Sequence, residues 1–147
     1  LVNWEALKKV EKDTKTQTAV MQSVPEALPA LIRARKVQKK AADVGFDWSD
    51  VSGALDKLEE EISELRHAIA KGDAENTAEE LGDVLFSAVN VSRFVKADAE
   101  EALTSASDKF LARFTTVEKL AGERGIDMNS AGIDVLDALW DEAKAAE

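Results

Sequence analysis

The scarcity of helix breakers is the feature that most constrains this chain. Its two prolines, Pro25 and Pro29, lie in one short segment, and only seven glycines are spread over 147 residues. Proline and glycine are the residues that most often end helices and strands. A chain with so few of them favours long helices over many short strands, and its length suits one domain with its own core. The predicted fold class is therefore all-α.

Five helices are predicted from apolar periodicity and from capping residues. Pro25 suits the first turn of the first helix, and Ser49 or Asp50 can cap the second. Gly72 is a suitable C-terminal cap for the second helix, and Asp73 can cap the third. The predicted ranges are about 26–43, 50–70, 74–95 and 132–145, with a fourth helix that begins at Asp98 and ends near 122–125.

Two of these helices, on either side of Gly72, carry a continuous apolar stripe. Apolar residues recur there at alternating spacings of three and four, which is the periodicity of one helix face. We expect both stripes to form core rather than to bind a cofactor, and an antiparallel bundle of four to five helices packs them most simply. The stripe residues are Leu55, Leu58, Ile62, Leu65 and Ile69 before Gly72, and Leu81, Val84, Leu85, Ala88 and Val95 after it.

The charge of the chain is negative and unevenly distributed. The net charge is −10. Residues 1–48 carry nine basic and six acidic residues, or +3, whereas residues 49–147 carry ten and twenty-three, or −13. Binding of a nucleic-acid polymer needs a basic surface, so this charge argues against such a partner. The basic first third and the acidic remainder would together suit one anionic ligand held through a metal ion.

Cysteine content and hydropathy bound the setting of the chain. It has no cysteine, which excludes disulfides and thiolate metal sites. No apolar run approaches the roughly 18 residues that span a bilayer, and no signal-peptide pattern is present, so we expect no membrane partner and a cytoplasmic location. The lack of an initial Met suggests a domain cut from a longer protein. Residues 1–24 are interpreted as an interdomain linker or arm, and residues 25–147 as a helical domain.

Four carboxylates occupy matching positions on the two predicted helices that flank Gly72. At about 100° per residue, Glu61 lies about 80° to one side of its apolar stripe, and Glu64 about 60° further round. Glu80 and Asp83 have nearly the same offsets in the same rotational sense. Counted from Gly72, Glu64 and Glu80 are each eight residues away. The other two are each eleven residues away. If the helices are antiparallel, all four side chains meet at one height on one edge of the seam.

Such a group of acids predicts a divalent metal site. Four carboxylates at close range cannot all stay ionised without a compensating cation, and oxygen ligands select Mg²⁺ or Mn²⁺. The alternative is an acidic solvated surface without a metal, because glutamate-rich helices are common; Glu60, which points away from the apolar stripe, suits it. His67 forms a Glu-x-x-His with Glu64, as in di-iron bundles. The second such spacing ends in Asp83 instead of histidine, so a di-iron site is rejected.

The acidic motif resembles that of a known family. The segments EEISE at 60–64 and ELGD at 80–83 are similar to the Glu-Glu-x-x-Glu … Glu-x-x-Asp signature of MazG nucleotide pyrophosphohydrolases, members of the all-α NTP pyrophosphatase superfamily. Segments 28–48, 81–94 and 109–125 resemble the C-terminal domain of tandem-domain MazG proteins. The opening LVNWEALKKVEK resembles the segment that joins the two domains. The resemblance therefore covers nearly the whole chain and makes residues 25–147 a MazG-like domain.

The resemblance implies Mg²⁺-dependent hydrolysis of nucleoside triphosphates to the monophosphate and pyrophosphate. It implies broad or house-cleaning specificity, covering standard or modified nucleotides, and a homodimer of helical protomers. Matched to the family motif, the metal ligands are Glu61, Glu64, Glu80 and Asp83, and Glu60 occupies a further acidic motif position.

The chemistry can be assigned to residues as a hypothesis. A metal ion would neutralise the triphosphate and lower the pKa of a bound water that attacks the α-phosphorus, with Glu61 as general base. Glu60 is the second catalytic candidate. Lys109 and Arg113 are candidates for phosphate contacts, because Arg113 falls on the apolar side of its helix and Lys109 flanks it; Lys39 is a third. The alternative for these cations is structural ion pairing with the surplus acids.

Further residues are candidates for contacts with the nucleoside. Asn90, seven residues after Asp83, could bond sugar or phosphate, and its alternative is a solvated helix position. Phe46, Trp48 and Trp140 are candidates for stacking on the base, with core packing as the alternative for each.

Three functions are compatible with these residues. The leading hypothesis is the enzyme described above. The alternative is a helical regulatory or interaction module that retains the metal site but catalyses weakly. A purely structural dimerisation domain is the third, and it predicts no dependence of folding or turnover on a cation.

Overall fold

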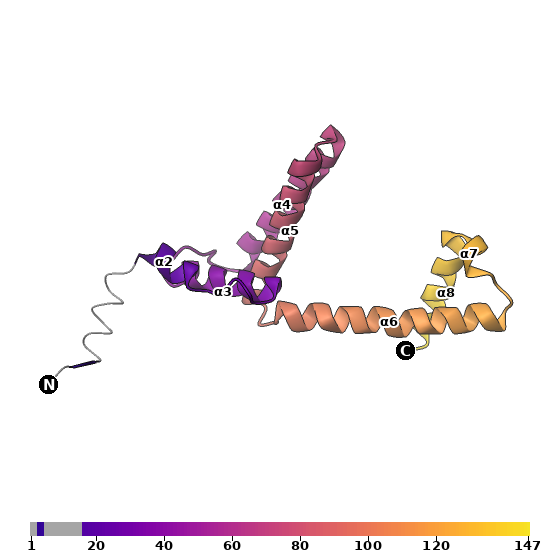
Figure 1. Cartoon of the computed structure of the whole chain (residues 1–147). Helices are drawn as coiled ribbons and strands as arrows, with labels where there is room; N and C mark the ends of the chain where they lie inside the picture. Colours follow the sequence, from indigo (N-terminus) through magenta and orange to yellow (C-terminus); the bar gives the residue numbers. More distant parts are fainter. Residues whose placement is uncertain (1–2, 5–15) are drawn as a thin grey trace. The chain divides into compact units, whose positions relative to one another are not determined.

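The computed structural model describes residues 3, 4 and 16–147, and every regular element in that part of the chain is a helix. This confirms the all-α fold class. The chain divides into two compact units, one up to Glu100 and one from Glu101 to Glu147, which are described separately. No helix among the described residues is both long and apolar enough to cross a membrane. Among the described residues, five longer helices match the five predicted ones (Figure 1). Two short helices lie outside those five: α2, at the end of a leader interpreted as possibly helical, and α7.

The first unit begins with two helices that pack on each other. Helix α2 spans Gln17–Gln22 and α3 spans Ala30–Ala42. The side-chain amide of Gln17 donates to the carbonyl of Lys40, 2.6 Å away, which ties the two helices together. The segment interpreted as a linker lies largely outside the described residues, which omit 1, 2 and 5–15. Its boundary at residue 24 stays a prediction.

The predicted start of α3 was wrong by four residues. The sequence analysis began this helix at Glu26, with Pro25 in its first turn, but Pro29 is the N-cap, at φ −50° and ψ 140°. Proline disfavours the helical conformation of the residue before it and has no N–H to donate. The second proline therefore delays the helix until Ala30.

The centre of the first unit is a hairpin of two 21-residue helices, α4 (Val51–Lys71) and α5 (Ala74–Phe94). Asp50 caps α4 by accepting from the Ser52 N–H, and Asp73 caps α5 by accepting from the Asn76 N–H. Gly72 ends α4 at φ +70°, a left-handed conformation that glycine adopts without steric cost. The tight turn sends α5 back alongside α4, as predicted (Figure 1).

The prediction that the two apolar stripes form core was wrong for this chain by itself. The buried residues of α4 are Ala54, Glu61 and Ala68, one position repeated every seven residues. Small side chains at such a position allow close approach of the two helices. Leu58, Leu65 and Val84 are half-buried. The other large stripe residues are exposed: Leu55 43%, Ile62 40%, Ile69 59%, Leu81 49%, Leu85 53% and Val95 54%.

The second unit packs a conventional apolar core. Helix α6 (Ala99–Glu123) runs into it, followed by α7 (Met128–Ala131) and α8 (Ile133–Ala145). The core consists of Val117 and Ala121 from α6 with Leu139 and Ala143 from α8, each at most 3% exposed. Leu120, Ile126, Met128, Leu136 and Trp140 pack around this core.

Candidate functional site

Three of the four predicted carboxylates meet at the α4–α5 seam. Glu61 of α4 and Glu80 and Asp83 of α5 each offer an oxygen, and these oxygens all lie within 4.8 Å of one another. Glu61 is 8% exposed, whereas Asp83 is on the surface. Because α4 and α5 are antiparallel, residues eleven positions before and after Gly72 come to the same height. We call these three side chains the acidic group.

The fourth predicted metal ligand, Glu64, lies outside the acidic group, but its negative charge affects the pKa of Glu80. Partial burial raises the pKa of the Glu80 carboxyl above its usual value, and the negative charges of Asp83, Glu61 and Glu64 raise it further. Glu79 adds a fourth negative charge, and a bound cation would relieve the repulsion among these carboxylates.

A lysine that the sequence analysis did not select lies beside the acidic group. The Lys57 ammonium is 3.0 Å from Glu61 Oε1 and 3.4 Å from Glu60 Oε1. The hydrogen bond to Glu61 is the main cause that raises the pKa of Lys57. Its spacing of four from Glu61 on a helix was the signal that could have revealed it. Glu60, the second catalytic candidate, is exposed and is engaged by this lysine.

The acidic group fits a hard divalent cation. It offers carboxylate oxygens on two facing helices, with neither sulfur nor imidazole among its members. Such a donor set suits Mg²⁺ or Mn²⁺ better than zinc or copper.

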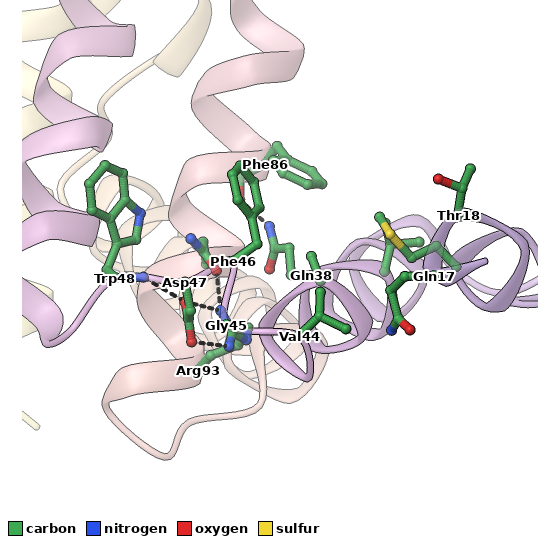
Figure 2. A pocket seen from close by; sticks show the side chains of 14 residues that line it. Gln17, Thr18, Gln38, Val44, Gly45, Phe46, Asp47, Trp48, Phe86 and Arg93 are labelled. Carbon is green, nitrogen blue, oxygen red and sulfur yellow. Dashed lines mark hydrogen bonds and ion pairs between the residues drawn. The ribbon is translucent and has the colours of Figure 1, made fainter. Parts of the chain in front are cut away.

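A cavity of about 550 Å³ lies in the first unit, and none of the four predicted metal ligands lines it (Figure 2). We call it the aromatic cavity, because Phe46, Trp48 and Phe86 line it. Phe46 is 81% exposed and Trp48 is 44% exposed, so both rings remain accessible to solvent. The α2, α3 and α5 helices and the 43–48 loop supply the other lining residues: Gln17, Thr18, Met21, Val37, Gln38, Ala41, Val44, Gly45, Asp47, Asn90 and Arg93.

An ion pair fixes the loop that carries the aromatic rings. Arg93 of α5 donates to both carboxylate oxygens of Asp47, at 3.1 and 2.8 Å (Figure 2). The Arg93 hydrogen bonds lower the pKa of Asp47. Arg93 also donates to Asn90 Oδ1 at 2.6 Å. Asn90, predicted as a sugar or phosphate contact, thus lines the aromatic cavity and is oriented by arginine.

Trp48, predicted to stack on a base, packs on the first turn of α4. A Cβ built at Gly53 would lie 2.8 Å from the Trp48 ring, so only glycine allows this approach. Trp48 therefore has one face on the helix, and its remaining surface borders the aromatic cavity.

Three predicted substrate contacts lie in the second unit. Arg113 forms a two-point ion pair with Glu147, and its guanidinium lies 5.7 Å from the centre of the Trp140 ring. Trp140 also packs on Phe110, with 5.1 Å between ring centres. Lys109 is exposed. Arg113 thus has the ion pair, and Trp140 the packing contact, that were the alternatives to substrate binding. A phosphate role for Lys109 and Arg113 stays a prediction.

On α3, a residue that lines the aromatic cavity is the neighbour of the one predicted to bind substrate. Lys39, a predicted phosphate contact, is exposed on that helix. The adjacent Gln38 is 6% exposed and lines the aromatic cavity, although the sequence analysis did not select it. A polar residue on the apolar face of α3, seven positions after Leu31, was the available signal.

Comparison with known proteins identifies the family. A family model for the MazG nucleotide pyrophosphohydrolase domain matches residues 49–119, which include the acidic group. The nucleoside triphosphate pyrophosphohydrolase of Escherichia coli (strain K12) is 38% identical over 100% of this chain and 57% of its own length. The nucleoside triphosphate pyrophosphohydrolase/pyrophosphatase MazG of Thermotoga maritima is 41% identical over 98% of this chain and 55% of its own.

A third relative, the uncharacterized protein YabN of Bacillus subtilis (strain 168), is 47% identical over 100% of this chain and 30% of its own length. The chain therefore spans little more than half of the two named pyrophosphohydrolases, and less than a third of YabN. Fold, motif and relatives agree, and residues 49–119 of this chain belong to the MazG nucleotide pyrophosphohydrolase domain family.

Proposed function

We propose that this chain is a Mg²⁺-dependent nucleoside triphosphate pyrophosphohydrolase, which converts NTP or dNTP and water to the monophosphate and pyrophosphate. The observation that carries the proposal is the acidic group at the α4–α5 seam, within the segment that matches the MazG domain. Two relatives that match nearly all of this chain bear that activity in their names. Mn²⁺ would substitute for Mg²⁺, because both prefer oxygen ligands.

The acidic group would hold the cation, with Glu64 as the fourth ligand. When bound, Mg²⁺ would neutralise charge on the phosphates and lower the pKa of a coordinated water. Glu61 would accept the proton of the water that attacks the α-phosphorus, as the bond to the bridging oxygen breaks and pyrophosphate leaves. Glu61 suits this role because its carboxylate is largely buried in the seam.

Lys57 would change partners during this cycle. In the absence of a cation its ammonium pairs with Glu61. A cation at the acidic group would repel it, and its flexible stem would let it turn to a phosphate oxygen. Lys57 would thus neutralise Glu61 in the free protein and a phosphate oxygen in the complex.

The active form would be a homodimer. The stripe residues Leu55, Ile62 and Ile69 of α4 and Leu81 and Leu85 of α5 are each at least 40% exposed. A contiguous apolar face of this kind on paired helices marks an interaction surface, and two such hairpins can form a four-helix arrangement. The expected result of sedimentation analysis is a dimer, and Ile69→Lys is expected to yield monomers; a native chain that is monomeric at micromolar concentration would contradict this.

The test of the activity is product analysis in H₂¹⁸O with and without EDTA. We expect Mg²⁺-dependent release of pyrophosphate, with ¹⁸O in the monophosphate and none in pyrophosphate. A helical regulatory module that retains the metal site would bind Mg²⁺ and release no pyrophosphate from any of the eight common NTPs and dNTPs. A purely structural domain would do neither.

A further inference from the structure

The aromatic cavity contains a buried hydrogen-bond acceptor with no partner. Gln38 is 6% exposed, and its Nε2 donates to the backbone carbonyl of Phe86 at 2.9 Å. A carbonyl can only accept, so this bond fixes which end of the Gln38 amide faces Phe86. The other end, Oε1, is buried and is the single buried side-chain atom of the described residues without a hydrogen-bond partner. A buried acceptor in this state favours a ligand that brings an N–H.

The same cavity contains a donor whose direction is also fixed. Asn90 Oδ1 accepts from Arg93, and a guanidinium can only donate. The Asn90 Nδ2 group therefore points away from the arginine and remains available to donate to a ligand. Asp47 holds Arg93 in place through the two-point ion pair, so the arrangement does not depend on one flexible side chain. The aromatic cavity thus offers one acceptor and one donor of defined polarity.

Helix α5 connects this cavity to the acidic group. Asn90 lies seven residues after Asp83, which is about 10 Å along the helix axis and about 20° around it. Both side chains therefore leave α5 on nearly the same face. One molecule with an anionic end and a flat polar ring could extend from the acidic group to the cavity. A nucleotide has this form, with exposed Phe46 and Trp48 rings available for stacking.

We propose that the aromatic cavity is a nucleobase pocket that selects an amidine edge, the adjacent amino group and ring nitrogen found in adenine and cytosine. Gln38 Oε1 accepts from the exocyclic amino group, and Asn90 Nδ2 donates to the ring nitrogen. Adenine and cytosine present these amino donors, whereas thymine and guanine present carbonyl acceptors in the corresponding places. A carbonyl there would face another acceptor, Gln38 Oε1, whose amide is held in this orientation by its bond to the Phe86 carbonyl. The proposal rests on the proposed function for the placement of the triphosphate.

The pocket lies mostly before the segment that matches the MazG family model, although the relatives align with that part of the chain as well. Gln38, Phe46 and Trp48 precede residue 49, where the match to the MazG domain begins. Base selection would therefore depend on α3 and the loop that follows it, in addition to the segment that carries the acidic group.

The first experiment compares substrate pairs that differ by one amino group. We expect kcat/KM for ATP to exceed that for purine riboside triphosphate by at least about tenfold, since loss of the amino group leaves Gln38 Oε1 unpaired. CTP should exceed both UTP and the analogue that lacks the 4-amino group. Equal rates within both amino pairs would overturn the proposal.

Variants assign the selectivity to the residue. Gln38→Met retains length and apolar contact but lacks the acceptor, and the ratio of ATP to purine riboside triphosphate should fall to about one. Gln22→Met is the matched control, since Gln22 is exposed on α2 and does not line the cavity. It should retain the wild-type ratio. A Gln38→Met protein that keeps the full ratio would contradict the assignment, and circular dichroism checks that both variants are folded.

A binding measurement separates this proposal from the proposed function. AMP and purine riboside monophosphate are titrated without Mg²⁺, and quenching of tryptophan fluorescence is followed in the wild type and in a Trp48→Phe variant. AMP should bind at least about tenfold more tightly, with a quench that depends on Trp48. Equal affinities would sink the base pocket even if pyrophosphate is released. Selective binding without pyrophosphate release would sink the hydrolase alone.

Discussion

The α4–α5 hairpin buries polar side chains together with small apolar ones, whereas the second unit buries apolar side chains alone. The second unit encloses apolar residues such as Val117 and Leu139, as folding by the hydrophobic effect requires. The hairpin buries Ala54, Glu61 and Ala68 and leaves Ile69 and other large apolar residues exposed. The seam of the hairpin thus encloses the carboxylate of Glu61 between two buried alanines. The buried carboxylate supports the proposed cation site, and the exposed apolar residues support the proposed association with a second chain.

The strongest test of this contrast removes the buried carboxylate. Glu61→Gln is expected to lower kcat by about a hundredfold or more, because the variant loses both a ligand and the general base. Glu59→Gln on the same helix is exposed and outside the acidic group, so it should retain wild-type turnover. Initial rates of pyrophosphate release check both variants. Full turnover by Glu61→Gln would remove the catalytic role of the seam.

Core truncation should affect the two regions differently. Leu139 is 2% exposed, and Leu139→Ala should lower the free energy of unfolding by about 2–4 kcal/mol at every protein concentration. Ile69→Ala should instead weaken association, so its loss of stability should depend on protein concentration. Urea unfolding at two protein concentrations measures this. A concentration-independent loss for Ile69→Ala would mean that Ile69 packs within its own protomer.

Arg113 tests whether the second unit is only structural. Arg113→Lys retains the charge but loses the two-point geometry, and it is expected to raise KM for the nucleotide about tenfold if the guanidinium binds phosphate. Arg124→Lys is the control, because Arg124 makes the same kind of pair with Glu142. Steady-state kinetics decide between the roles. Equal KM values in both variants would leave Arg113 as a partner of Glu147 alone.

The smallest expected effect is a pH dependence of opposite sign in the two regions. The folded-state pKa of Glu80 is raised above 4.5, so without metal its contribution to stability falls as pH rises from 4.5 through the raised value. Arg124 lowers the pKa of Glu142, so that contribution is present above 4.5 and is lost as pH falls through the lowered pKa.

Unfolding of Glu80→Gln and Glu142→Gln at a series of pH values, each compared with wild type, measures these terms. The Glu80→Gln difference should grow in favour of the variant as pH rises, and the Glu142→Gln difference should grow in favour of wild type. The same sign for both would contradict the assigned environments.

Helix positions were predictable because local signals decided them. Asp50, Gly72 and Asp73 each lie where the cap was expected. The start of α3 was not predictable, because either proline could precede a helix and only the structure identifies Pro29 as the N-cap. The antiparallel register that joins Glu61 with Glu80 and Asp83 followed from counting residues on each side of the turn.

Other parts of the site could not be predicted, because they depend on contacts between distant segments. The hydrogen bond between Gln38 and Phe86 joins residues 48 positions apart in the sequence. The ion pair between Arg93 and Asp47 joins residues 46 positions apart. The face of α4 that enters the seam was also misjudged. Periodicity identifies an apolar stripe but not what covers it, and here Ala68 faces α5 while Ile69 faces outward.

The most direct measurement of the central claim is a crystal structure of the chain with Mn²⁺ and a nucleotide analogue that resists cleavage at the α-phosphate. The account predicts an anomalous manganese peak between the carboxylates of Glu61, Glu80 and Asp83, in contact with phosphate oxygens and lost in Glu80→Gln. Nucleotide bound with no manganese peak at the α4–α5 seam, or manganese held elsewhere, would contradict it.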